Sequence, residues 1–134
     1  MDRDIKQLSG IIRETAFSLH CYLKHGHLEK VYENGLAYRL RKAGLKVLTQ
    51  HPLQVFDQDG TVLGDYLADM FIEDCLIAEV KAVRKLADEH LAQLFGYMRA
   101  SRIEHGLLMN FGAPRFEIHK YILTSPATGW SEEE

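Results

Sequence analysis

Apolar residues in the first third of the chain recur at helical spacing. From Ile5 to Leu23 they return every three or four positions, which predicts a long amphipathic helix. His25-Gly26-His27 interrupts the pattern. A second helical pattern extends from Leu28 to Leu40 and stops before Gly44, a residue type that commonly ends helices. The chain is therefore expected to begin with two helices.

After Gly44 the hydrophobic period changes to two, which is typical of strands. Residues 45–55 alternate, and Pro52 among them indicates a sheet edge or a bulge. The remaining patterns predict a helix over 87–98 and strands over 61–72, 76–83, 106–111 and 116–123. The order α-α-β-β-β-α-β-β predicts one α/β domain over residues 1–125, and residues 126–134 are expected to form a polar acidic tail.

Three charged residues interrupt the apolar faces of the second and third predicted strands. Asp69 shares a face with Leu67 and Phe71, and Glu79 shares one with Lys81. With a three-residue turn between the strands, Asp69 lies directly opposite Glu79. Opposed residues have Cβ atoms about 4.5–5.5 Å apart, and like charges there destabilise a sheet.

A divalent cation would remove this repulsion, because paired carboxylates with water and phosphate oxygens form the environment that Mg²⁺ prefers. Lys81 lies on the same side as Glu79, where it could help to activate water or stabilise a phosphoryl transition state. The alternative is a structural ion pair of Lys81 with Glu79 or Asp69. Glu33 is expected to be either a solvated charge or one adjacent to Lys30.

This arrangement resembles a known one. Asp69 followed by Glu79-Val80-Lys81 is similar to the signature of the PD-(D/E)XK nuclease superfamily. Upstream, Gly26-His-Leu-Glu29-Lys-Val-Tyr32 resembles the motif of the GxxExxY proteins, a branch of that superfamily. Four further segments look like family blocks, namely residues 28–37, 66–70, 92–97 and 106–112, so that the resemblance extends to about Leu123.

The resemblance implies a restriction-endonuclease-like core, a central mixed sheet flanked by helices. Asp69 and Glu79 would then hold Mg²⁺ or Mn²⁺, with Glu29 as an additional acidic ligand or catalytic group, and Lys81 would serve the attacking water. Gln93 and Tyr97 match a Gln-x-x-x-Tyr motif whose side chains line the site in one branch of the superfamily.

One position departs from the family pattern. Leu67 stands where the family commonly has arginine. Contacts to nucleic-acid phosphates are therefore expected to depend on Lys81, Arg84 and Lys85, which follow the third predicted strand.

Composition limits the function classes. The chain has 134 residues, 16 Lys+Arg against 19 Asp+Glu, and a formal net charge of −3, which argues against a strongly electrostatic nucleic-acid binder. Three of the acids are the terminal residues 132–134, so the rest of the chain is neutral. Two cysteines form neither a disulfide framework nor a zinc cluster. With no membrane-spanning apolar run and no apolar signal segment, a cytoplasmic protein is expected.

The sequence therefore favours a metal-dependent nuclease that hydrolyses phosphodiester bonds, with DNA a more natural substrate than RNA and a homodimer as a possible assembly. One alternative is a catalytically silent nucleic-acid-binding or protein-interaction module that retains the nuclease fold. Another is a structural or regulatory subunit in which the charged face is an ion-pair network.

Overall fold

The structure is a computed structural model that describes residues 4–125 and 129–133. Its elements follow the predicted order as far as the fifth strand, and a sixth strand, which the sequence patterns do not predict, comes after it. The elements are α1 (Ile5–Leu23), α2 (Glu29–Lys42), β1 (Val47–Phe56), β2 (Val62–Ile72), β3 (Leu76–Lys81), α3 (Asp88–Ser101), β4 (His105–Asn110), β5 (Glu117–Ser125) and β6 (Gly129–Glu133).

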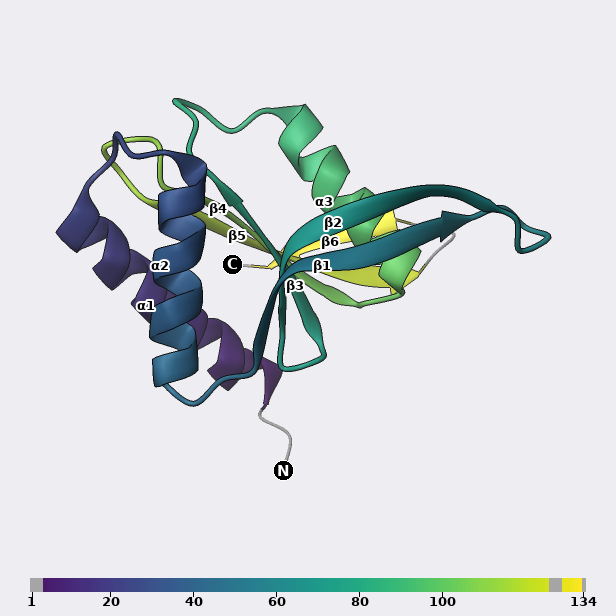
Figure 1. Cartoon of the computed structure of the whole chain (residues 1–134), viewed down its shortest axis with the longest axis horizontal. Helices are drawn as coiled ribbons and strands as arrows, with labels where there is room; N and C mark the ends of the chain where they lie inside the picture. Colours follow the sequence, from purple (N-terminus) through teal and green to yellow (C-terminus); the bar gives the residue numbers. More distant parts are fainter. Residues whose placement is uncertain (1–3, 126–128, 134) are drawn as a thin grey trace.

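All six strands form one mixed sheet whose spatial order follows the sequence, from β1 to β6 (Figure 1). β3 and β4 are parallel and are joined across a face of the sheet by α3, whereas the other neighbouring pairs are antiparallel. β1 lies at an edge, which explains why it accommodates Pro52, a residue without a backbone N–H. The predicted α/β fold with a central mixed sheet is confirmed.

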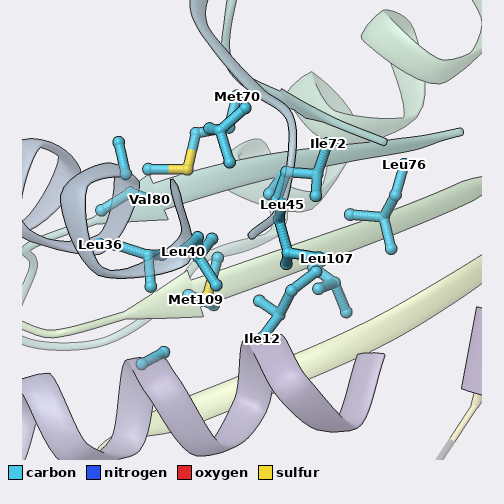
Figure 2. Close-up of a cluster of buried hydrophobic side chains, with 14 of the residues drawn as sticks. Ile12, Leu36, Leu40, Leu45, Met70, Ile72, Leu76, Val80, Leu107 and Met109 are labelled. Atoms are coloured by element: carbon cyan, nitrogen blue, oxygen red, sulfur yellow. The ribbon is translucent and has the colours of Figure 1, made fainter. Parts of the chain in front are cut away.

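Two hydrophobic clusters cover the two faces of the sheet. α1 and α2 pack on one face, against alternate residues of β3 and β4 such as Val80 and Met109 (Figure 2). α3 packs on the other face, where Leu94 and Met98 meet Ile77. The alternation of β3 between the clusters follows from the two-residue period of a strand.

The β1–β2 hairpin passes from one cluster to the other along its length. Val47 and Met70 belong to the cluster on the side of α1 and α2, whereas Leu53 belongs to that of α3. The transition occurs at Gln50, which has a left-handed backbone (φ 50°) and for which the ladder of β1 and β2 contains no pair. The hairpin then projects beyond the rest of the sheet beside α3 (Figure 1).

α2 and α3 lie on opposite faces of the sheet, but both helices begin at the same end of it. Their N-terminal ends lie at the upper side of the view in Figure 1, where the C-terminal end of β3 also lies. Within the described residues, no helix is long and apolar enough to cross a membrane.

Candidate active site

The carboxylates of β2 and β3 meet where the backbone pairing of these strands stops. The ladder ends at Met70 opposite Ala78, and its register places Asp69 opposite Glu79, as predicted. Beyond this point the two carboxylates, rather than backbone carbonyls, accept the hydrogen bonds between the strands. The Asp69 amide donates to Glu79 Oε2, and the Val80 amide donates to Asp69 Oδ2, both at 2.8 Å. Each carboxylate thus accepts a hydrogen bond from the opposing strand.

The two carboxyl groups are electrostatically strained. Glu79 is only 1% exposed. Burial, reinforced by the charge of Asp69, raises the pKa of Glu79 to about 8. Burial also raises the pKa of Asp69, to about 6, and the charges of Glu33 and Glu29 add to this effect while Lys81 opposes it. Ionising both groups would therefore place more negative charge here than the surrounding groups neutralise, and a bound cation would remove that penalty.

Lys81 leads from this pair to α3. Its Nζ lies 3.9 Å from Glu79 Oε1 but donates a much shorter hydrogen bond, 2.6 Å, to Gln93 Oε1. Gln93 also hydrogen-bonds with the Tyr97 side chain one turn later, and burial together with the charges of Glu79 and Asp69 raises the pKa of Tyr97. The structure therefore brings together Asp69, Glu79, Lys81, Gln93 and Tyr97. The contact with Gln93 means that Lys81 is not committed to a tight ion pair with Glu79.

α2 contributes acidic groups to the same region. Glu29, its first residue, is exposed, and its charge raises the pKa of both Asp69 and Glu79. Glu33 differs from the expectation of a solvated charge. It does lie beside Lys30, at 2.6 Å, but it is only 3% exposed. Its spacing of one helical turn from Glu29 was the available signal that it faces the same way.

Gln50 is a further polar group that the sequence analysis did not single out. Its Nε2 donates to Glu33 Oε1 at 2.8 Å. The flanking pairs of the ladder, Thr49 with Met70 and His51 with Ala68, place Gln50 opposite Asp69, although the two residues are not themselves paired. The left-handed backbone of Gln50 therefore lies beside the acidic pair. The hydrophobic pattern of a sequence does not show a local change of backbone conformation at one residue, and for this reason the sequence analysis did not identify Gln50.

The chain that leaves β3 is fixed by the end of β4. Asn110 is fully buried, and its Oδ1 accepts from the amides of Val83 and Gly112, both at 3.0 Å, while its Nδ2 donates to the Val83 carbonyl at 2.9 Å. The Phe111 amide donates to the Lys81 carbonyl at 2.8 Å. A Cβ on Gly112 would lie 2.2 Å from the Val83 nitrogen, so only glycine allows this approach.

Arg84 and Lys85 follow this fixed segment and are exposed on the connection between β3 and α3. Metal-binding groups are sparse: among the described residues, no three His, Cys, Asp or Glu side chains converge closely enough to hold a metal ion. The donors at the site are thus the two carboxylates of Asp69 and Glu79. Asp69 Oδ1 and Glu79 Oε1 are the oxygens that the backbone hydrogen bonds leave unused.

Comparison with known proteins identifies the family. The model of the PD-(D/E)XK nuclease superfamily matches residues 6–121, and the chain belongs to this superfamily. The crystal structure of SSO0001 is similar in fold, with a TM-score of 0.58 and 21% sequence identity over 68% of this chain. The matched region covers 48% of SSO0001, so this chain spans about half the length of that protein. No curated protein matches the sequence significantly.

Proposed function

We propose that this member of the PD-(D/E)XK nuclease superfamily is a nuclease that hydrolyses phosphodiester bonds of nucleic acid with a divalent cation held by Asp69 and Glu79. The observation that carries the proposal is the buried acidic pair, in which burial raises the pKa of both carboxyl groups and the charge of Asp69 raises the pKa of Glu79 further. The segment that resembles the GxxExxY motif supplies Glu29 beside this pair, and we assign the chain to that branch on this basis.

The donor set fits Mg²⁺ or Mn²⁺. Both groups are carboxylates, and hard divalent cations prefer oxygen ligands and retain several waters. Asp69 Oδ1 and Glu79 Oε1 would hold the ion, with Glu29 as a further acidic group at the rim. When bound, such an ion lowers the pKa of water and neutralises charge on a phosphate.

The neighbouring side chains position the reacting groups. Gln93 Oε1 holds the Lys81 ammonium near Glu79, where Lys81 can donate to a phosphate oxygen or to the attacking water. Tyr97 hydrogen-bonds with Gln93 and lies near enough to the pair for the charges of Glu79 and Asp69 to raise its pKa. Arg84 and Lys85 continue from Lys81 as exposed contacts for phosphates on either side of the scissile bond.

The test is cleavage of labelled single-stranded and duplex DNA and RNA in Mg²⁺ and in Mn²⁺. Asp69→Asn and Lys81→Ala are each expected to lower the cleavage rate by two orders of magnitude or more. Asp69→Asn keeps an oxygen that can accept from the Val80 amide, so the fold is expected to survive. Mn²⁺ binding by calorimetry should be present in the wild type and lost in Asp69→Asn.

The matched control is Lys46→Ala. Lys46 is an exposed lysine at the opposite end of the β2–β3 pair, where its Nζ lies 3.0 Å from an Asp74 oxygen. This variant should cleave like the wild type. Cleavage that persists in both Asp69→Asn and Lys81→Ala would refute the site. Nucleic-acid binding without any turnover in either metal would instead identify a catalytically silent module.

A further inference from the structure

A groove lies between the β1–β2 hairpin and α3, on the same side of the sheet as Tyr97. It measures 350 Å³, and its lining includes Phe56 and Tyr66 from the hairpin and Gly96, Arg99 and Arg102 from the end of α3. The aromatic side chains of the hairpin are strongly exposed for their size, 54% for Phe56 and 47% for Tyr66. Neither residue has a role in the site described above.

The groove is continuous with the candidate active site. The rings of Tyr66 and Tyr97 lie 5.4 Å apart, and Tyr97 hydrogen-bonds with Gln93, the partner of Lys81. A chain of contacts therefore runs from the acidic pair through Tyr97 to Tyr66. If a nucleic-acid strand is bound at Asp69 and Glu79 and continues towards α3, it enters this groove.

The groove is basic where the active site is acidic. Arg99 and Arg102 are both exposed, and none of the described residues that line the groove is a carboxylate. Their place at the C-terminal end of α3 is also favoured by the helix dipole. The helix dipole explains the two arginines, but it does not explain why they share one groove with two exposed aromatic rings. A ligand that combines negative charge with planar groups would use both features.

We propose that this groove binds a single-stranded segment of nucleic acid, with unpaired bases against Tyr66 and Phe56 and phosphates beside Arg99 and Arg102. The inference rests on the proposed nuclease function, because the groove is read as the path of the strand whose phosphate lies at Asp69 and Glu79. Unpaired bases present their faces to aromatic side chains, whereas the bases of a duplex are stacked on one another and present only their edges. The proposal therefore selects single strands over duplexes.

Gly96 offers a substitution that tests the groove without endangering the fold. It lies within α3, and a Cβ placed there meets no atom within 4 Å. Gly96→Leu would fill the groove while replacing the helix-weakening glycine by a good helix former. Gly10 provides the matched control, because it is an exposed glycine within α1 at which an added Cβ would also meet nothing within 4 Å.

The experiment measures fluorescence anisotropy of labelled dT₁₂, rU₁₂ and a blunt duplex in EDTA, where binding is separated from cleavage. We expect single strands to bind at least tenfold more tightly than the duplex. Tyr66→Ala should weaken single-strand binding by about fivefold or more, the effect of losing one stacked base. Gly96→Leu should weaken it at least tenfold, and Gly10→Leu should not change it. Arg99→Gln should reduce the slope of log affinity against log salt by about 0.7.

The outcomes separate the groove from the chemistry. Equal or tighter binding of the duplex, or unchanged single-strand binding in Gly96→Leu, would overturn the groove even if the wild type cleaves nucleic acid in Mn²⁺. Tight single-strand binding that Gly96→Leu abolishes would support the groove even if no cleavage occurs. The dT₁₂ and rU₁₂ arms distinguish DNA from RNA as the source of the strand.

Discussion

Replacing Glu79 by glutamine should make the metal-free protein more stable at neutral and alkaline pH. Burial raises the pKa of Glu79 from 4.5 to about 8 in the folded chain. Between these values the native state holds a proton that the unfolded state has lost, so the free energy of unfolding falls as pH rises. Each pH unit above 4.5 costs about 1.4 kcal/mol, which amounts to an upper figure of about 3 kcal/mol at pH 7.

Glu79→Gln removes this penalty and keeps a side-chain oxygen for the Asp69 amide. In EDTA at pH 8, urea unfolding should show the variant to be more stable than the wild type by up to about 4 kcal/mol, and the difference should shrink to below about 1 kcal/mol at pH 5. Mn²⁺ at one hundred times its dissociation constant should then stabilise the wild type by about 2.7 kcal/mol and leave Glu79→Gln unchanged.

The control is Glu104→Gln, which makes the same change at an exposed carboxylate between α3 and β4. Its stability should follow the wild type at both pH values. The reasoning fails if the wild type is as stable at pH 8 as Glu79→Gln, because the acidic pair would then not be strained. It fails equally if both proteins gain the same stability from Mn²⁺, because the ion would then bind elsewhere.

Three further changes test the surroundings of the pair. Asn110→Ala removes a fully buried side chain and leaves the amide and carbonyl of Val83 without their partner, so it should lower the free energy of unfolding by about 3 kcal/mol or more in urea. Gly112→Ala places a Cβ 2.2 Å from the Val83 nitrogen, and the variant should unfold at a markedly lower temperature or fail to fold, as followed by circular dichroism. Glu33→Gln removes a charge that raises the pKa of Asp69, so the Asp69 carboxyl carbon should titrate at lower pH by NMR; an unchanged midpoint would refute that coupling.

The sequence predicted the features that depend on period and spacing. The three-residue turn at 73–75 determined the register of β2 and β3, and this register places Asp69 opposite Glu79 as the structure has it. The resemblance to a Gln-x-x-x-Tyr motif pointed to Gln93 and Tyr97, and their separation of four residues puts them on one side of α3. Residues whose role depends on backbone conformation were not predicted: Gln50 acts through a left-handed φ.

The β6 strand was missed for a different reason. Gly129–Glu133 is a short, polar segment at the sheet edge, paired only with β5. Its sequence, Gly-Trp-Ser-Glu-Glu, contains one large apolar residue and therefore no alternating apolar pattern from which a strand could be predicted. The groove beside α3 was missed because Phe56 and Arg99 are far apart in the sequence and meet only through the projection of the hairpin. Hydrophobic patterning specifies which face is buried, but not which exposed groups converge.

The position of the acidic pair explains why substitutions by alanine would give a misleading result here. In most of the sheet the backbone groups satisfy one another, but beyond Met70 and Ala78 the carboxylates of Asp69 and Glu79 take over as acceptors for two strand amides. Asp69→Ala would therefore remove a ligand and also leave the Val80 amide without its acceptor, at a cost of about 1–3 kcal/mol. Loss of activity in that variant would not separate chemistry from folding. Asp69→Asn retains the acceptor and relieves the charge, so a variant that is more stable yet inactive would show that the charge is kept for the cation.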